Sequence, residues 1–223
     1  MDTEGAAASI SASISVIIPT LNAAVTLEAI VGALTAQASP VKEIIVIDSA
    51  SVDGTAALAG TLGCKVLTIA REEFNHGLTR NVAAQAATGD VLIFMTQDAL
   101  PANDRLTAEL LVPLKDPRTA ASYARQIAAE DAAPIERFSR EFNYPNVPIV
   151  KSLDILDERG IKTFFFSNVC SAIKRDIFIE LGGFQPAIMN EDMLFSSRLI
   201  LSGYKVAYWP EAAVVHSHNY SFI

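Results

Sequence analysis

The chain has 223 residues, 51% of them hydrophobic, with a formal net charge of −8 and a mean hydropathy of +0.31. This length suffices for one large domain or two small ones with a full core. The acidic balance excludes a general nucleic-acid binder, whose phosphate contacts need clustered Lys and Arg. No run approaches the roughly 18 apolar residues of a transmembrane helix. The N-terminus carries acids where a secretory signal would be basic.

The two cysteines point to the same class of protein. Cys64 and Cys170 lie far apart, each in an apolar, strand-like context. We expect buried free thiols rather than a disulfide or a zinc site built from thiolates. Together, these features predict a soluble, globular protein of the cytoplasm.

The first hundred residues alternate short apolar runs with stretches of helical periodicity. The apolar runs are continuous, which is typical of parallel strands covered on both faces. One helix is expected to begin with Thr26 as its N-cap, another to begin at about Thr55, and a third to end at Gly89 as a C′ glycine. The predicted strands are residues 14–19, 44–47, 65–70 and 91–95. This order indicates a doubly wound α/β sheet, in which ligands collect at the carboxyl ends of the strands.

Polar residues stand at those strand ends: Thr20 and Asn22, Asp48, Arg71, and Asp98. A carboxylate in the position of Asp48 can accept hydrogen bonds from the edge of a ligand, such as a pyrimidine N3–H. It can equally cap a turn, because the stretch DSASVDGT is rich in such groups. Asp53 and Gly54 are more simply explained as turn residues.

The stretch FNHGLTRNVAA places His76 and Arg80 four residues apart, on one face of a helix. Arg80 near the start of this helix can bind a phosphate, and it can equally be a solvated surface cation. The stretch lacks the glycine spacing of a P-loop or of a dinucleotide-binding loop. Residue pattern alone leaves both interpretations of Arg80 open.

The second half is less regular than the first. Helices are predicted over 104–114 and 190–204, a strand or bend over 119–129, a strand, turn and helix over 162–184, and a strand over 205–210. Residues 131–157 are expected to be loop-rich and aromatic. The buried face of the 190–204 helix is expected to hold Met193, Leu194, Leu199 and Ile200. Because no long linker separates the halves, we expect a flexible leader of residues 1–13 and a single domain over 14–223.

The run VLIFMTQDALP ends a buried strand with a single carboxylate, Asp98. One carboxylate can ligate Mg²⁺ or Mn²⁺, because such ions often keep several waters and bind substrate phosphates. His216 and His218 in the C-terminal HSH alternate, so they would point to the same side of an extended strand. These three residues form a candidate metal site.

Glu191 and Asp192 open the helix predicted over 190–204. Acids in a first turn are favoured by the helix macrodipole, which is the structural explanation. A carboxylate that faces a cleft can also act as a general base toward a hydroxyl. Their spacing does not separate the two explanations.

Five stretches in order resemble family 2 inverting glycosyltransferases of the GT-A fold: SVIIPTLNA, IIVIDSASVDGT, HGLTRNVAAQAATGDVLIFMTQDALP, GGF, and NEDMLFSSRLILSGYKVAYWPEAAVVHSHNYS. The similarity runs from about Ile14 to the end and is greatest to bacterial rhamnosyltransferase-like members. It implies an α/β, Rossmann-like and mostly parallel sheet with helices on both faces, joined to a smaller mixed half. Residues 14–100 would bind the nucleotide sugar, and residues 101–223 would bind the acceptor.

The resemblance also implies roles for single residues. Asp192 would be the general base, with Glu191 beside it near the acceptor. Asp98 would hold a divalent metal, Mg²⁺ or Mn²⁺, with His216 or His218 completing its shell. The expected substrate-binding residues are Pro19, Thr20, Asn22, Asp48, Arg80, Gln97, Gly183 and Phe184.

Within that set the resemblance gives finer roles. Asp48 would meet the pyrimidine ring, and Arg80 would approach the nucleotide or its diphosphate. Gly183 and Phe184 of the GGF stretch would form acceptor-side walls together with the aromatic segment 137–147, and packing in the core explains any single aromatic there equally well.

One position departs from the family pattern. Thr96 stands where the Asp-x-Asp metal motif has its first acid, and Gln97 fills the middle. The metal would therefore lack one protein carboxylate. It would depend more on the donor diphosphate, a histidine and water.

The implied reaction moves a deoxyhexose, rhamnose first, to a glycan or lipid-linked glycan in cell-surface polysaccharide synthesis. The favoured donor is a thymidine diphosphate sugar, with a uridine diphosphate sugar as the alternative. The acceptor hydroxyl would attack the anomeric carbon in line while Asp192 takes its proton, so the anomeric centre inverts. We expect a cytoplasmic protein without a nucleic-acid partner, and peripheral association with the inner face of the plasma membrane is left open.

Two other functions compete with this one. A non-catalytic nucleotide-sugar-binding module is supported by Thr96 and by the end of the chain at Ile223, because family members commonly carry more chain after the histidine motif. The retained Asp98, Glu191 and Asp192 favour the enzyme. A nucleotidyltransferase would normally carry a Gly-rich basic loop after the first strand, and PTLNAAVTLE contains no Lys, Arg or Gly.

Overall fold

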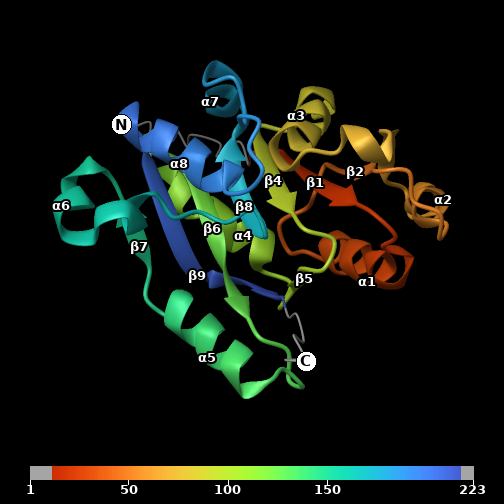
Figure 1. Cartoon of the computed structure of the whole chain (residues 1–223), viewed down its shortest axis with the longest axis horizontal. Coiled ribbons are helices and arrows are strands. Elements are labelled where there is room, and N and C mark those ends of the chain that lie inside the picture. Colours follow the sequence, from red (N-terminus) through yellow and green to blue (C-terminus); the bar gives the residue numbers. More distant parts are fainter. Residues whose placement is uncertain (1–11, 217–223) are drawn as a thin grey trace, which may run out of the picture.

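The structure is a computed structural model that describes residues 12–216. Within this range nine strands form one mixed sheet, with helices on both of its faces (Figure 1). The strands are β1 (Ile14–Thr20), β2 (Glu43–Asp48), β3 (Lys65–Thr68), β4 (Val91–Met95), β5 (Leu100–Pro101), β6 (Thr119–Ile127), β7 (Ile149–Lys151), β8 (Cys170–Lys174) and β9 (Lys205–Val215). The α-helices are α1 (Ala24–Thr35), α2 (Thr55–Thr61), α3 (His76–Ala86), α4 (Leu106–Leu111), α5 (Pro134–Asn143), α6 (Leu156–Arg159), α7 (Arg175–Glu180) and α8 (Glu191–Leu201). Short 3₁₀ turns are η1 (Arg71–Glu73), η2 (Pro113–Lys115), η3 (Leu153–Ile155) and η4 (Gly160–Phe164).

The strand order is β3-β2-β1-β4-β8-β6-β9-β5, with β7 paired to β9. Strands β3, β2, β1 and β4 run parallel, as their continuous apolar runs predict. The direction reverses at β8, which is antiparallel to both β4 and β6. The expected parallel sheet joined to a mixed half is therefore confirmed. The β4–β8 pairing carries the sheet across the predicted division at residue 100 without a break, and most of the predicted leader lies outside the described residues.

The core lies on both faces of the sheet. On the face covered by α3, α7 and α8, the rings of Phe94, Phe178, Phe184 and Phe195 pack against one another with centroids 5.0–5.4 Å apart. On the other face, α1 and α4 pack their leucines against β1 and β4. Because each central strand is covered twice, both of its faces must be apolar, which explains the unbroken hydrophobic runs. Burying one such side chain stabilises the fold by about 1.5–3 kcal/mol.

Two predicted helix ends are wrong. Helix α1 begins after Ala23 rather than at Thr26, and the Thr26 hydroxyl instead donates a hydrogen bond to the Gln97 carbonyl at 2.8 Å. Helix α3 ends at Ala86, and Gly89 is not among the glycines with positive φ. A Cβ on Gly89 would lie 2.6 Å from the Ser15 nitrogen. This glycine is therefore required by the close approach of β1, not by a helix end.

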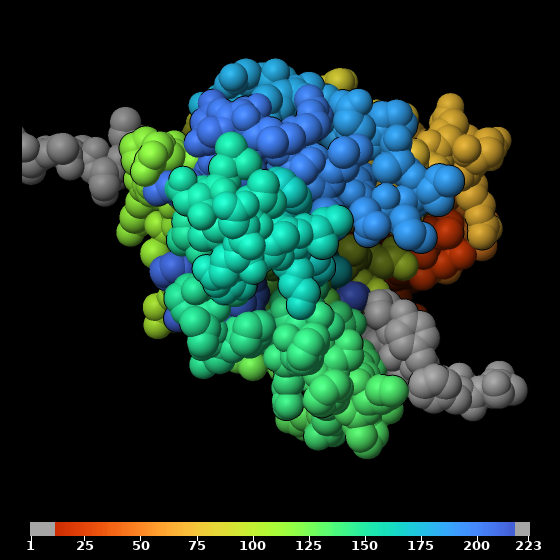
Figure 2. Space-filling model, turned by 60° about the vertical axis from the view of Figure 1, so that its left-hand side comes forward, coloured from red at the N-terminus to blue at the C-terminus, as the bar shows by residue number. Residues whose placement is uncertain are grey.

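The aromatic stretch expected to be loop-rich contains helix α5, which Pro134 starts at its N1 position. Its apolar side chains face outward, because Phe138 and Phe142 are each 67% exposed and stack on one another. Its inward face carries Glu136, which pairs with Arg140. In Figure 2, α5 (green) lies below the teal segment that contains β7, α6 and η4. The prediction missed this helix because its hydrophobic stripe covers no core.

Other differences in the second half are smaller. Leu194, expected in the buried face of α8, is exposed, and Phe195 takes its place in the core. Strand β9 continues past the predicted end at residue 210 as far as Val215. The thiols of Cys64 and Cys170 are free, the second buried and the first half-buried. No helix among residues 12–216 combines the length and the apolar character needed to cross a membrane.

Candidate active site

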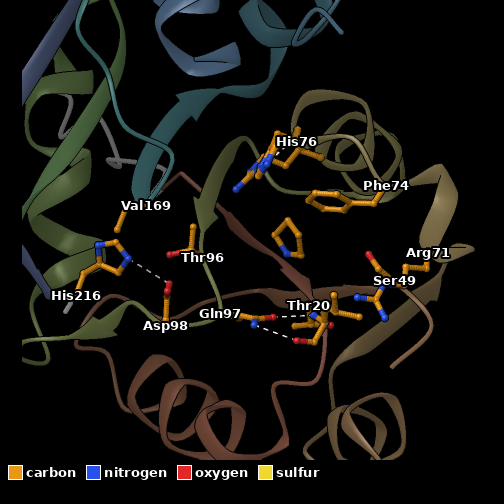
Figure 3. A pocket seen from close by; sticks show the side chains of 13 residues that line it. Thr20, Ser49, Arg71, Phe74, His76, Thr96, Gln97, Asp98, Val169 and His216 are labelled. Carbon is orange, nitrogen blue, oxygen red and sulfur yellow. Dashed lines mark hydrogen bonds and ion pairs between the residues drawn. The ribbon is translucent and has the colours of Figure 1, made fainter. Parts of the chain in front are cut away.

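A cavity of about 500 Å³ opens at the carboxyl ends of β1, β2 and β4 (Figure 3). This is the edge of the sheet at which the parallel strands predict a ligand site. Its lining comprises Pro19, Thr20, Leu21, Ser49, Arg71, Phe74, His76, Arg80, Thr96, Gln97, Asp98, Val169 and His216. Figure 3 shows Ser49, Arg71 and Phe74 at one end, and Asp98 and His216 at the other. The two ends therefore differ in chemistry, with an aromatic ring and a cation at one and metal-type ligands at the other.

Asp48 does not line this cavity and is instead bonded to neighbouring loops. One carboxylate oxygen accepts hydrogen bonds from the hydroxyls of Thr20 at 2.9 Å and Ser51 at 2.5 Å, and the other accepts from the Ser51 N–H at 2.9 Å. Asn22 has a φ of 51° and accepts a hydrogen bond from the Val52 N–H at 3.0 Å. Both residues brace the loops that follow β1 and β2, and thereby shape the cavity wall formed by Thr20.

Gln97 lines the cavity and also clamps two of its loops together. Its Oε1 accepts from the Leu21 N–H at 2.7 Å, and its Nε2 donates to the Leu21 carbonyl at 3.1 Å. This paired contact ties the end of β4 to the end of β1. A glutamine suits the middle of the Thr-Gln-Asp stretch because an amide can both donate and accept at one backbone position.

Arg80 is not a surface cation, since only 4% of it is exposed. Its Nη1 donates to the His76 carbonyl at 2.7 Å and lies 3.6 Å from Oε1 of Glu191. Burial lowers the pKa of Arg80, and the charges of Glu191 and Asp192 oppose that shift. The Arg80 guanidinium is thus a buried positive group at the cavity wall. In this position it can form charge-assisted hydrogen bonds to an anionic ligand.

Three buried polar atoms that belong to cavity-lining residues have no hydrogen-bond partner within the described chain. They are Ser49 Oγ, Arg80 Nε and Thr96 Oγ1. Buried polar atoms in native proteins are nearly always bonded, so each orphan needs an explanation. All three atoms can donate a hydrogen bond, two as hydroxyls and one as a guanidinium N–H. Three donors around one cavity fit a polar, anionic ligand.

Glu191 and Asp192 start helix α8 beside Arg80 and are bridged by Asn168. The Asn168 N–H donates to Oδ2 of Asp192 at 3.1 Å, and its side-chain Nδ2 donates to Oε1 of Glu191 at 3.2 Å. Burial raises the pKa of Asp192, and the neighbouring Glu191 charge raises it further. Neither acid is among the cavity-lining residues, and Arg80 links Glu191 to the cavity. A half-buried carboxyl with a raised pKa is suited to accept a proton.

Asp98 and His216 meet at the other end of the cavity, with Oδ1 and Nε2 3.4 Å apart. Behind them, Oε1 of Gln126 receives a hydrogen bond from Arg140 and lies 3.0 Å from Nδ1 of His216. A guanidinium only donates, so this atom of Gln126 must be the oxygen and Nδ1 must carry a proton. The other ring nitrogen, Nε2, then faces the Asp98 carboxylate.

A carboxylate and an imidazole nitrogen are both groups that can ligate a divalent cation. Among the described residues there is no group of three or more His, Cys, Asp and Glu side chains arranged to hold a metal. Asp98 and His216 supply two ligands, which suits an ion that takes the rest of its shell from substrate and water. His218, the third predicted ligand, lies outside the described residues.

Gly183 and Phe184 lie away from the cavity. Phe184 is buried in the aromatic core, and its backbone N–H and carbonyl both bond to the side chain of Asn81. Gly183 has a φ of 67°, and a Cβ there would lie 2.6 Å from the Asn81 oxygen. The positions of both residues in this structure are explained by packing between α3 and α8.

Several residues of this site are absent from the sequence-based predictions. Asn168 and Gln126 are buried polar residues, one just before β8 and one within β6. No sequence signal sets Gln126 apart, because its strand also carries Thr119, Ser122 and Arg125. Ser49 and Phe74 carry no signal either, because a serine and an aromatic ring in loops have many ordinary roles.

Comparison with known sequences places the chain among sugar-transferring proteins. Residues 15–182 match the family model described as Glycosyl transferase family 2. The chain is 43% identical over 211 residues to the O-antigen chain rhamnosyltransferase RfbN of Salmonella typhimurium, which covers 93% of this chain and 67% of that protein. It is 42% identical over 187 residues to the O-antigen chain rhamnosyltransferase WbaN of Salmonella anatum, which covers 83% of this chain and 59% of that protein. The chain thus matches about two thirds or less of the length of each relative.

Solved structures share the fold at lower identity. The mannosyltransferase PcManGT from Pyrobaculum calidifontis, in complex with GDP-Man and Mn²⁺, aligns with a TM-score of 0.71 at 21% identity, over 94% of this chain and 58% of that one. TarS of S. aureus (residues 1–349), in complex with UDP-GlcNAc, aligns with a TM-score of 0.72 at 18% identity, over 94% of this chain and 60% of that one. These likenesses show that the fold is of the GT-A type. With its family match over residues 15–182, the chain belongs to glycosyl transferase family 2.

Proposed function

We propose that this chain transfers a sugar from a nucleoside-diphosphate donor to a hydroxyl of a glycan or lipid-linked glycan acceptor, with inversion at the anomeric carbon. The observation that carries the proposal is the cavity at the strand ends. Three buried polar atoms on its wall have no partner among the described residues, and an acid pair adjoins its Arg80. A donor diphosphate would satisfy Arg80 and the Thr96 hydroxyl, and the nucleoside of the donor would meet the Ser49 hydroxyl. The nucleobase of the donor would lie toward Phe74 and Arg71. There it can stack on the Phe74 ring and accept hydrogen bonds from the Arg71 guanidinium.

In this scheme Asp192 takes the proton of the acceptor hydroxyl as that oxygen attacks the anomeric carbon. The raised pKa of Asp192 suits this role, because a base that holds its proton more firmly drives the transfer further. Arg80 offsets the negative charge that develops on the departing diphosphate. Asp98, His216 and His218 would hold a divalent cation, Mg²⁺ or Mn²⁺, which when bound adds positive charge beside that leaving group.

The identity of the sugar rests on the relatives. Two O-antigen chain rhamnosyltransferases that are 42–43% identical support rhamnose as the transferred sugar. A thymidine diphosphate is the carrier that the sequence resemblance favours. Neighbours in complex with GDP-Man and Mn²⁺, or with UDP-GlcNAc, support a nucleoside-diphosphate sugar and a divalent cation in general. The free thiols of Cys64 and Cys170 support a reducing, cytoplasmic location. The acceptor and the activity of the whole protein belong to this proposal, as does peripheral association with the membrane.

The test is a donor screen followed by a transfer assay. Melting temperature is measured with thymidine, uridine and guanosine diphosphate sugars, each with and without Mn²⁺. We expect the largest stabilisation from dTDP-rhamnose with Mn²⁺, and transfer of rhamnose to a glycan acceptor. Asp192→Asn should abolish transfer while the donor-induced stabilisation remains. Donor binding without any transfer by the unmodified chain would favour a non-catalytic binding module, for which Thr96 in the metal motif is the motivation.

A further inference from the structure

Asn168 is the one described residue that bonds to both members of the acid pair Glu191–Asp192. We infer that Asn168 is a positioning residue for the general base: its side chain fixes the peptide whose N–H holds the Asp192 carboxylate. This inference rests on the proposed function and adds a residue to it. Asn168 does not line the cavity and takes no proton itself.

Three hydrogen bonds immobilise Asn168, which is only 3% exposed. Its backbone N–H donates to Oδ2 of Asp192 at 3.1 Å, and its Nδ2 donates to Oε1 of Glu191 at 3.2 Å. Its Oδ1 accepts from the hydroxyl of Ser171, a fully buried residue of β8, at 3.0 Å. The side chain is thus held between the sheet and helix α8. Because the side chain is held in this way, it fixes the direction of the Asn168 backbone N–H.

The orientation of the amide follows from its neighbours. Glu191 pairs with Arg80, so its Oε1 acts as an acceptor and the nitrogen of Asn168 must face it. The amide oxygen is then directed at Ser171, whose hydroxyl can donate. An asparagine amide does both from two separate atoms, because its nitrogen donates and its oxygen accepts. An aspartate would place a third carboxylate against the pair.

Asp192 depends on this peptide for its contact beyond its own helix. Its Oδ1 accepts from the Met193 N–H at 2.7 Å, which is a bond within α8. Its Oδ2 receives the Asn168 N–H. If that peptide turned away, the carboxylate would be free to rotate about its χ angles. Misplacement of a reacting group by about 1 Å costs on the order of a hundredfold in rate.

The charges around Asp192 allow a readout that simple structural damage would not produce. Burial raises the pKa of Asp192 most. Glu191 on the same helix raises it further, and Arg80 from α3 lowers it. Tyr144, which follows α5, also lies close enough to sense the Asp192 charge. The Asn168 N–H lowers the pKa by favouring the ionised form. Asn168→Asp adds negative charge to this set, so it should raise the pKa of the base and move the acid limb of the kcat profile to higher pH.

The experiment compares Asn168→Asp, Asn168→Ala and Ser171→Ala with the unmodified chain. Rhamnose transfer is followed from pH 5 to 9, and donor affinity and melting temperature are measured in parallel. We expect kcat to fall by about a hundredfold in Asn168→Ala, with donor affinity within about twofold, and by a smaller factor in Ser171→Ala, which frees only the amide oxygen. In Asn168→Asp the acid limb should also shift upward in pH. Asn103→Asp, the same change at an exposed residue, should alter neither.

The outcomes separate this inference from the function on which it rests. If Asp192→Asn keeps its turnover, the general base is wrong and the role of Asn168 is wrong with it. If Asp192→Asn is inactive while Asn168→Ala and Ser171→Ala both retain the normal kcat and pH profile, only the positioning role is overturned. Should Asn168→Asp fail to fold, Ser171→Ala still decides, because it adds no charge and leaves the Glu191 contact in place.

Discussion

Arg80 of α3 and Glu191 of α8 form a buried ion pair, with 3.6 Å between Nη1 and Oε1. The two residues come from opposite sides of residue 100, so the pair joins helices from the two halves of the chain beside the cavity. Removing both charges from water is costly, and such a pair is a weak source of stability. Arg80 Nε has no hydrogen-bond partner among residues 12–216, and the pair lies beside a cavity. The proposed anionic donor therefore accounts for the pair better than folding does.

Replacing one member of this pair should destabilise the fold strongly. Arg80→Met leaves Glu191 buried without its cation, and we expect the free energy of unfolding to fall by about 3–5 kcal/mol. The exposed pair Arg159–Glu158 supplies the control, where Arg159→Met should cost under about 1 kcal/mol. Urea unfolding at neutral pH measures both. If both variants lose the same small amount of unfolding free energy, an apolar side chain can replace the buried Arg80 guanidinium.

The Asp192 carboxyl should make stability depend on pH. Its pKa is raised by burial, so the folded state binds the proton more tightly than the unfolded state does. Stability therefore falls as pH rises through the window between the ordinary Asp value and the raised value, and Asp192 in its ionised form is destabilising at pH 7. Asp192→Asn should thus raise the melting temperature at pH 7, and this gain should shrink as the pH is lowered.

The exposed Asp157 offers the matched change for this experiment. Asp157→Asn removes the same charge from the surface, and its melting temperature should follow that of the unmodified chain at every pH. A melting temperature of Asp192→Asn that lies below normal at pH 7 would contradict a raised pKa of the Asp192 carboxyl in the folded chain.

The cavity end at Asp98 and His216 should bind a divalent cation. Asp98→Asn should remove Mn²⁺ binding measured by titration calorimetry with a nucleoside diphosphate present. Gln126→Leu should weaken it about 10–100-fold, because the His216 ring loses the partner that fixes its tautomer. The control is Asp104→Asn, an exposed change close by in sequence. Unchanged Mn²⁺ affinity in both Asp98→Asn and Gln126→Leu would place the cation elsewhere.

Gly89 should tolerate no side chain. A Cβ there would meet the Ser15 nitrogen at 2.6 Å, which is backbone of β1 and cannot move aside. We expect Gly89→Ala to lower the free energy of unfolding by about 1–3 kcal/mol. Gly32 in α1 has open space around it, so Gly32→Ala should raise stability by about 0.5–1 kcal/mol. Opposite signs in denaturant unfolding are the expected result, and a loss at both positions would contradict it.

Lys151 should make stability rise with pH on the alkaline side. It is 3% exposed, its Nζ donates to the Tyr123 hydroxyl at 2.7 Å and the Phe165 carbonyl at 2.5 Å, and burial lowers its pKa to about 7. Between pH 7 and the ordinary lysine value the unfolded state binds more protons, so the free energy of unfolding should gain up to about 1.4 kcal/mol per pH unit.

Lys151→Met should abolish this slope, whereas the exposed change Lys115→Met should leave it intact. Urea unfolding at pH 7, 8 and 9 measures the slope directly. A pH-independent stability in the unmodified chain would show that Lys151 stays charged, held by the Tyr123 and Phe165 rings that lie 4.8 and 5.4 Å from its Nζ.

The sequence by itself predicted the architecture of the first half well. The strands of that half are covered on both faces, so their side chains must all be apolar and the run is visible without any structure. The order of the motifs predicted the family, and the strand ends predicted the edge at which the cavity lies. Pro19, Thr20, Arg80, Gln97, Asp98 and His216 were named from the sequence and lie together on its wall.

Only the tertiary structure decided how the polar side chains are used. Asp48, Gly183 and Phe184 look like ligand-binding residues in the sequence, yet Asp48 bonds to loops and the other two pack between helices. Gln126 reaches His216 and Asn168 reaches Asp192 across contacts that no local periodicity encodes. The physical reason is that periodicity reports which face of an element is buried, whereas a hydrogen bond depends on which distant element packs against that face.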